Sequence, residues 1–227
     1  MRNWNFEGSL PRVGVVLALG VLAAGCTATS QYMHAPSAPV PTIAPPNAAV
    51  VVFLRPSHYG EGVLTTILDD RGAFMGDSIG GTEFSVILPP GPHVFLSWAE
   101  NTAPLQATLL PGRVYYVEVS PRMGFWSTRV QLLAITPRSE SWKEVDEWMR
   151  ECSQLVPDAA AGQAYLNGRA AGVAERIRRA RERLGGLEAD ERNERTLNPE
   201  DGVQSQAPVL VATSASVPPA PSVPSSK

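Results

Sequence analysis

Short apolar runs separated by turn residues fill residues 48–137, and they limit the fold more than any other feature of the chain. Val, Ile, Phe and Tyr dominate these runs, which is typical of strands. Because Pro fixes φ and Gly accepts positive φ, we expect a type II turn at Pro89-Pro90-Gly91 and a similar turn at Pro111-Gly112. This succession predicts a mainly β fold, an Ig-like or transthyretin-like β-sandwich. The predicted strands are 49–55, 63–68, 73–75, 83–88, 93–98, 107–110, 114–119 and 127–136.

Two of these runs also predict which faces are buried. Residues 49–54 are apolar at every position, which indicates a strand covered on both faces. Tyr115 and Tyr116 are neighbours in another strand, and successive side chains point to opposite faces. We therefore expect one of these two tyrosines to lie outside the core.

After Pro137 the apolar period changes to about 3.6, so residues 138–186 predict an amphipathic helical pair that follows the sandwich. Ser141 and Glu144 form a possible capping box at its start. The first apolar face consists of Trp142, Val145, Trp148 or Met149, Cys152, and Leu155 or Val156. The second consists of Leu166, Ala170, Val173, Ile177, Ala180 and Leu184. Half of the second face is small, so we expect it to pack on the first helix or on a partner.

Four segments of the β region carry a family resemblance. They are Phe53-Leu54-Arg55-Pro56, Asp70-Arg71-Gly72, Leu88-Pro89-Pro90-Gly91-Pro92-His93 and Pro111-Gly112-Arg113-Val114-Tyr115-Tyr116-Val117. In this order they resemble a bacterial family of small lipoproteins that carry a β-sandwich domain of unknown function, with aromatic-Arg-Pro, Pro-Gly-x-His and Gly-x-x-Tyr-Tyr-Val motifs. Pro92 replaces the usual basic residue, and Leu54 stands where an aromatic is common. Because the motifs are turn and core residues, the resemblance implies the fold and no activity.

Residues 1–25 have the three parts of a secretory signal: a polar leader with basic residues, an apolar core over 13–22 and small residues before Cys26. The apolar core is too short to span a bilayer. The run 21–26 resembles the bacterial lipoprotein signal, although Ala23 stands where Leu is usual. It predicts cleavage before Cys26 and lipidation of Cys26, with acyl chains such as palmitate. An ordinary signal peptide cut nearby and an uncleaved anchor are the alternatives.

Lipidation would place the chain permanently on a membrane, because two or more acyl chains do not dissociate readily. Thr27 is not the Asp that retains many lipoproteins in the inner membrane, so the outer membrane is favoured, with the domain facing the periplasm. Residues 26–47 are rich in Pro and Ala and predict an anchor with a tether of up to about 60 Å. Residues 187–227 predict a disordered tail.

Composition excludes some classes of protein. A net charge of −3 and 44% hydrophobic content over 227 residues fit one globular domain with flanking segments and give no indication of nucleic-acid binding. With Cys26 lipidated, Cys152 has no intramolecular partner. A buried apolar thiol is the favoured interpretation of Cys152, and an intermolecular bridge is the alternative.

The sequence offers little catalytic chemistry. Gly76-Asp77-Ser78-Ile79-Gly80-Gly81 resembles a nucleophile motif of esterases or trypsin-like proteases, and Ser78 would need a histidine base. Esterases place that base far downstream, whereas the last histidine is His93, and the chain is too short for a protease double barrel. We therefore expect a Gly-rich turn and no enzyme. His34, His58 and His93 lack ligand spacing, so neither a metal nor a cofactor is expected.

Two features indicate binding surfaces. One is a loop that carries Arg122, Phe125 and Trp126, and the other is a basic face with Arg178 and Arg179, whose charges also pair with glutamates one helical turn away. The leading interpretation is a non-catalytic protein-interaction or structural module whose helical segment contacts another envelope protein. The alternative is a glycan- or peptidoglycan-binding module that uses both surfaces.

Overall fold

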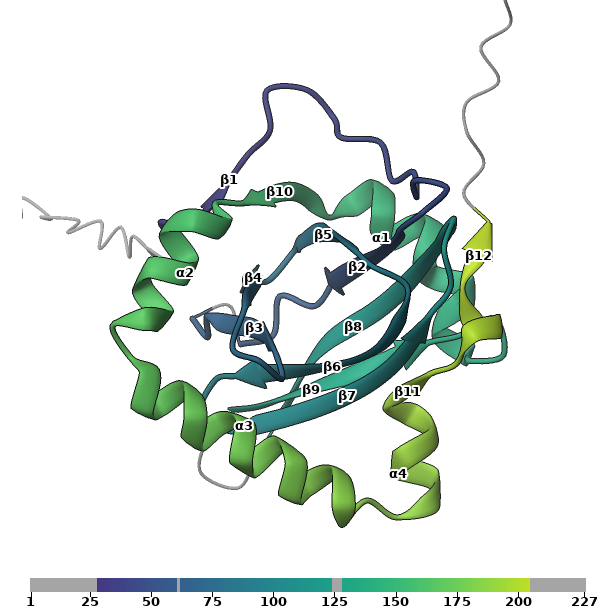
Figure 1. The fold of residues 1–227 in the computed structure, drawn as a ribbon. Coiled ribbons are helices and arrows are strands. Elements are labelled where there is room, and N and C mark those ends of the chain that lie inside the picture. Colours follow the sequence, from purple (N-terminus) through teal and green to yellow (C-terminus); the bar gives the residue numbers. More distant parts are fainter. Residues whose placement is uncertain (1–27, 61, 124–127, 205–227) are drawn as a thin grey trace, which may run out of the picture.

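The computed structural model describes residues 28–60, 62–123 and 128–204 (Figure 1). These residues form two β-sheets with short helices around them, so the prediction of a mainly β, sandwich-like fold is confirmed. Cys26, Phe125 and Trp126 lie outside the described residues.

Both sheets are mixed, since β2–β8, β10–β5 and β11–β7 are parallel pairs. The first sheet has the order β1-β10-β5-β2-β8-β12, with β9 also paired to β8. Its strands are β1 (Met33–His34), β2 (Ala49–Arg55), β5 (Thr82–Leu88), β8 (Arg113–Met123), β9 (Thr128–Ile135), β10 (Ser153–Pro157) and β12 (Val203–Gln204). The second has the order β11-β7-β6-β3-β4. Its strands are β3 (Thr65–Asp69), β4 (Phe74–Ser78), β6 (Gly91–Trp98), β7 (Thr102–Leu109) and β11 (Thr196–Leu197).

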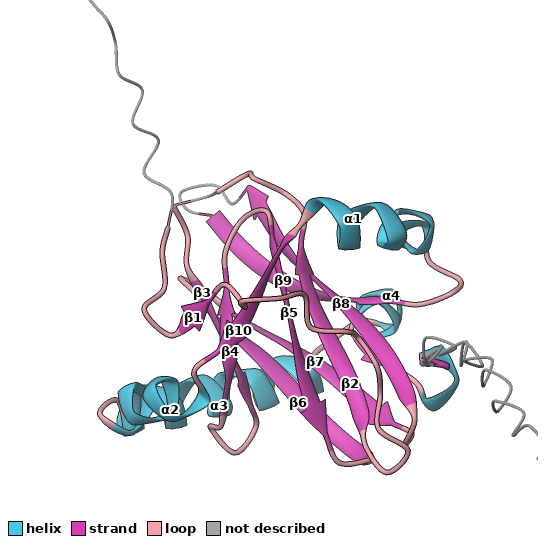
Figure 2. Ribbon diagram, turned by 90° about the horizontal axis from the view of Figure 1, so that it is seen from above, coloured by secondary structure: helices cyan, strands magenta, loops and turns pink. Residues whose placement is uncertain are grey.

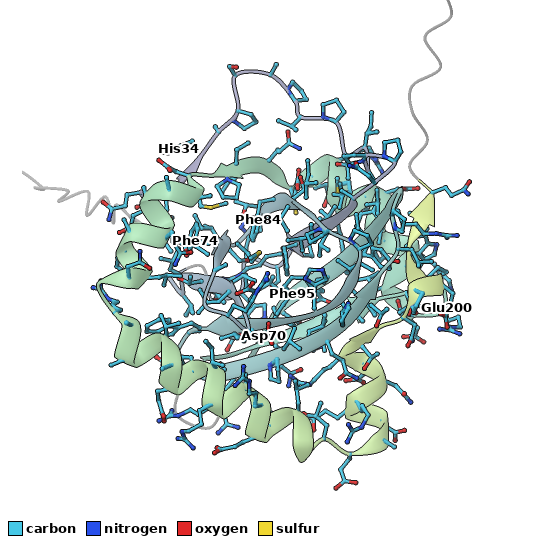
Figure 3. All side chains as sticks on the ribbon, in the orientation of Figure 1. His34, Asp70, Phe74, Phe84, Phe95 and Glu200 are labelled. Atoms are coloured by element: carbon cyan, nitrogen blue, oxygen red, sulfur yellow. The ribbon has the colours of Figure 1, made fainter. Side chains whose placement is uncertain are left out.

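The main core lies between the two sheets. Phe53 of β2 stacks on Phe84 of β5 with a centroid distance of 5.1 Å and meets Phe95 of β6 edge-on at 5.4 Å. Figure 3 shows Phe84 and Phe95 inside the molecule. All three rings are almost fully buried, which stabilises the fold by about 1.5–3 kcal/mol for each ring.

Strand β2 is covered on both faces, as its sequence predicts, because all seven of its residues are buried. Its alternate residues Val50, Val52 and Leu54 form a second cluster with Val145 of α1 (Val145–Glu151), which follows the 3-10 helix η1 (Glu140–Glu144). The two tyrosines lie on opposite faces as predicted, but neither lies outside: Tyr115 is in the central core, and Tyr116 packs partly buried in this second cluster. Figure 2 shows α1 on one side of the strands and α2 and α3 on another.

The C-terminal helical segment differs from the prediction. Helix α1 ends at Glu151, and residues 153–157 form strand β10, which pairs with β5 and β1. The predicted second helix is divided into α2 (Ala159–Asn167) and α3 (Ala170–Gly185). Their apolar residues pack on the second sheet, where Leu166, Val173 and Ala180 contact Leu68, Phe74 and Leu96. The apolar face therefore finds its partner in the sheet instead of in α1.

Two segments predicted to be extended or disordered belong to the fold over their described parts. In the expected tether, Met33 is 6% exposed and Ala44 is 8% exposed, because β1 adds to the edge of the first sheet. In the expected tail, α4 (Ala189–Glu194), β11, η2 (Pro199–Asp201) and β12 follow one another. The Tyr115 hydroxyl donates to the carbonyl of Pro199 over 3.0 Å and so ties this segment to β8.

The positive φ predicted for the Pro-Gly turns is present, whereas the turn predicted at Gly76-Asp77-Ser78 is not. Gly91 and Gly112 have φ of +119° and +71°, the positive values expected after Pro90 and Pro111. Gly76-Asp77-Ser78 is not a turn, because these residues complete strand β4. Ser78 is 2% exposed at the end of β4, and the turn expected here lies after it.

Candidate functional site

A cleft with a volume of about 710 Å³ lies between α3, α4, the start of β9 and the β6–β7 turn. We call it the arginine cleft, because four arginines line it beside three glutamates. They are Arg129, Arg179, Arg183, Arg195, Glu100, Glu182 and Glu191. The Asn101 side chain holds the β6–β7 turn against β9, since it donates to the Val130 carbonyl and accepts from the Val130 N–H, each over 2.8 Å. The polar lining suits a charged ligand better than an apolar one.

Arg195 forms the buried wall of the arginine cleft. It lies between α4 and β11, its carbonyl accepts from Gln106 N over 3.0 Å, and its side chain is only 2% exposed. Its Nη2 donates to Glu191 Oε1 over 2.9 Å, whereas Nε and Nη1 have no acceptor among the described residues. Burial lowers the pKa of Arg195, and Glu191 opposes this effect. A buried guanidinium with two unpaired donors is an unusual and costly arrangement.

The carboxylate of Glu191 accepts hydrogen bonds from two of the arginines, Arg183 and Arg195. Glu191 accepts from Arg183 Nη2 over 2.6 Å, and this hydrogen bond is the largest cause that lowers the pKa of Glu191. Arg179 bonds to Glu175 over 2.7 Å. The Arg129 side chain is exposed and has no hydrogen bond or ion pair to any of the described residues. The exposed and unpaired charge in the cleft therefore comes from Arg129, and the buried Arg195 adds positive charge behind the cleft wall.

The structure separates the two arginines that the sequence singled out on α3. Arg179 lines the arginine cleft, whereas Arg178 lies on another surface beside Asp70 and Arg71. Arg178 pairs with Glu175 over 2.7 Å and with Glu182. The hydrogen bonds from Arg178 and Arg179 lower the pKa of Glu175 to about 2. These pairs are the helical neighbours that the spacing predicts.

Arg122 lies near the same cleft but not in its lining. It is exposed on β8, and its Cα is the register partner of Arg129 across the β8–β9 hairpin. Residues 124–127, which include the candidates Phe125 and Trp126, connect these two strands and lie outside the described residues. The hairpin therefore brings Arg122 next to a cleft residue that sequence reasoning missed.

A second hollow surface lies beside the start of α3. Two adjoining hollows of about 410 and 350 Å³ share Leu64, Thr66 and Tyr165. Trp98 lines the first hollow and Tyr32 lines the second. We call this surface the aromatic recess, defined by Tyr32, Trp98 and Tyr165. Trp98 ends the predicted strand 93–98, whereas no pattern in the sequence indicates Tyr32 or Tyr165 as part of a surface.

The possible nucleophile Ser78 has no catalytic setting among the described residues. It is buried, and the neighbouring carboxylate of Asp77 accepts from the hydroxyls of Thr66 and Ser30 over 2.7 and 2.6 Å. His93 Nε2 lies 2.8 Å from the carbonyl of Pro89. Asp77 therefore acts as a structural acceptor that joins the N-terminal segment to β4.

Cys152 is a free and buried thiol, as its favoured interpretation predicts. Burial and the charge of Glu83 raise the pKa of Cys152 to about 11. A thiol with a raised pKa holds little thiolate at neutral pH and reacts slowly. Its position between α1 and β10 is consistent with a packing role.

Within the described part of the chain, no group of three His, Cys, Asp or Glu side chains could hold a metal ion. No helix of that part is both long and apolar enough to cross a membrane. Comparison of the chain with protein-family models, with curated proteins and with solved structures finds no match.

Proposed function

We propose that the protein is a lipid-anchored bacterial envelope lipoprotein that acts as a non-catalytic protein-interaction module. The signal over residues 1–25 and the lipidation site at Cys26 support the anchor, with the outer membrane and a periplasmic orientation favoured. The resemblance of residues 48–136 to small lipoproteins agrees with this proposal. Two facing sheets around one core support an Ig-like or transthyretin-like sandwich as the finer description of the fold.

One observation carries the interaction role: the buried Arg195 in the arginine cleft, with two donors that lack acceptors among the described residues. A carboxylate-bearing segment of a partner protein would add negative charge beside Arg129 and Arg195, and Arg is the residue best suited to bind carboxylates in two-pronged fashion. The partner is therefore an envelope protein with an exposed acidic segment. No enzyme activity, cofactor or nucleic acid forms part of the proposal.

Photo-crosslinking in cells tests this role. A photoreactive residue at Gln131, which lines the arginine cleft, should give a discrete crosslinked band in the membrane fraction. The matched control is the same residue at Ile87, which is 65% exposed on β5. A band from position 131 that disappears on Arg129→Glu would support the proposal. Equal labelling from both positions, or none from position 131, would refute it.

Glycan or peptidoglycan binding is the second candidate, and the register of the β8–β9 hairpin favours it. Arg122 and Arg129 are register partners where the chain enters and leaves residues 124–127, so Phe125 and Trp126 are joined directly to a strand that lines the arginine cleft. Aromatic rings and arginines together suit acidic sugars. Saturable, salt-resistant co-sedimentation with purified sacculi that Trp126→Ala abolishes would establish this function in place of the first.

A further inference from the structure

The chain enters the fold almost immediately after the proposed lipidation site. Ser30 Oγ donates to Asp77 Oδ2 over 2.6 Å, and Asp158 N donates to the carbonyl of Tyr32 over 2.8 Å. The Tyr32 ring lies 5.1 Å from the ring of Tyr165, measured between centroids. Met33 then enters the central core. Residues 30–33 are therefore fixed to α2, β4 and β10.

The short connection limits the distance between the lipid and the module. Only three residues lie between Cys26 and Ser30, so four residue steps join them, and an extended chain spans at most about 3.6 Å per step. Cys26 therefore lies within about 14 Å of Ser30 in any conformation. The sequence pattern predicted a tether of about 60 Å, and the contacts of residues 30–33 exclude such a separation for the described fold.

The surface around Ser30 has the composition of a membrane interface. It contains the aromatic recess, with Tyr32, Trp98 and Tyr165. The guanidinium carbon of Arg169 lies 3.8 Å from the centroid of the Tyr165 ring, and that of Arg176 lies 5.4 Å from the Trp98 ring. Trp and Tyr concentrate at the level of lipid headgroups, and Arg beside them can contact phosphates while its stem covers the rings.

The carboxylates of this surface are few or already engaged. Asp77 is buried and accepts from two hydroxyls, and Asp158 accepts from Ala161 N over 2.9 Å. Asp158 also lies 3.9 Å from His34 Nε2, and Figure 3 shows His34 at the end of β1 beside α2. Among the residues that the structure describes, Glu100 is the exposed acid that remains in the lining of the recess. The arginines therefore set the charge that this surface presents to anionic headgroups.

We propose that the module lies with its β1–α2 end against the membrane, so that the aromatic recess and Arg169 contact the headgroups of the bilayer that holds the lipid anchor. This orientation rests on the proposed lipidation of Cys26. Helix α3 has 16 residues, or about 24 Å, and it runs from this end to the arginine cleft beside α4 (Figures 1 and 2). The membrane contact thus lies toward the start of α3 and the arginine cleft toward its end, with Glu100 in the lining of both surfaces.

Depth-dependent quenching tests the orientation. The full chain, lipidated at Cys26 and carrying Cys152→Ala, is labelled with an environment-sensitive dye at Arg169→Cys or, as the matched control, at Asp190→Cys in α4, since both positions are exposed. Vesicles of phosphatidylethanolamine and phosphatidylglycerol carry a quencher on their headgroups. We expect the dye at position 169 to be quenched several-fold more than the dye at position 190, because headgroup quenching needs proximity and α3, about 24 Å long, separates the two positions.

The outcomes separate the orientation from the anchor. Flotation with the vesicles and selective quenching at position 169 support the proposed orientation. Flotation with equal quenching at both positions, or with greater quenching at position 190, overturns it while the lipid anchor stands. Protein that does not float with the vesicles overturns the proposed lipidation on which the orientation rests.

Discussion

Replacement of Glu83 by Gln should stabilise the folded module at neutral pH. Glu83 lies on β5 with 2% exposure, and its Oε2 has no hydrogen-bond partner among the described residues. Burial raises the pKa of Glu83 above its ordinary value of 4.5, and the contact with Gln154, which lowers the pKa, does not offset the burial. The folded chain therefore holds this proton more tightly than the unfolded chain does.

The direction of the pH dependence follows from this difference. When a carboxyl group has a higher pKa in the folded state, stability is greatest below the unfolded pKa of about 4.5 and falls as the pH rises through the folded pKa. A buried carboxylate oxygen without a donor costs on the order of 1–3 kcal/mol. We expect Glu83→Gln to raise the free energy of unfolding by about 1–3 kcal/mol at neutral pH and by much less at a pH below 4.5. Each kcal/mol would raise the thermal midpoint by about 2–4 °C.

Urea unfolding, followed by the fluorescence of Trp142 and Trp148 in the cluster beneath α1, measures this free energy at both pH values. The measurements use the Cys26→Ser variant, which needs no membrane. Glu140→Gln is the matched control, because Glu140 is exposed on η1. If Glu83→Gln destabilises the module at neutral pH, or changes it equally at both pH values, the buried and unpaired carboxylate is not a source of instability and the reasoning fails.

Three further predictions use the same unfolding measurement. Gly162→Ala should destabilise the module by about 1–3 kcal/mol, because the added Cβ would lie 2.3 Å from Phe74 Cδ1. The control Gly185→Ala should be neutral or slightly stabilising, because its Cβ would meet nothing within 4 Å. Met33→Ala should cost about 2–4 kcal/mol, and no change would show that this segment behaves as a free tether. Arg195→Met should leave the free energy of unfolding within about 2 kcal/mol or raise it, while abolishing the crosslink from position 131, and an intact crosslink would contradict the assigned role of Arg195.

The sequence predicts the strands well where alternation and turns agree, and it fails where pairing is decided at long range. Residues 152–156 fit a helical face, yet β10 forms because residues 82–84 of β5 offer a free edge. Strand β7 begins at Thr102, earlier than predicted. Its first residues were missed because Pro104 argues against a strand in the sequence. Pro104 is tolerated since its partner is Leu96 on one side, while β11 reaches only Gln106 and Ala107 on the other.

The candidate site is less predictable than the fold, because its residues are brought together by topology. Arg179 was identified from the basic face of its helix, but the same pattern gave equal weight to Arg178, which points to another surface. Arg129 and Arg195 belong to a strand start and a helix end that are far apart in the chain. A buried arginine has no signature in the sequence. Arg195 follows a short helix as many exposed charged residues do, and only the folded structure places Gln106 and Glu191 beside it.

The short connection to Cys26 restricts which partners the arginine cleft can reach. In the proposed lipid-anchored state, with Cys26 within about 14 Å of Ser30 and α3 about 24 Å long, the cleft would lie at most a few tens of ångströms from the bilayer. Val173 and Ala180 fix α3 to the second sheet, so the helix does not swing the cleft outward. The proposed partner would therefore have to bring its acidic segment close to the same membrane, as a second membrane-bound protein would. A partner held by the distant side of the envelope would need a long flexible segment of its own.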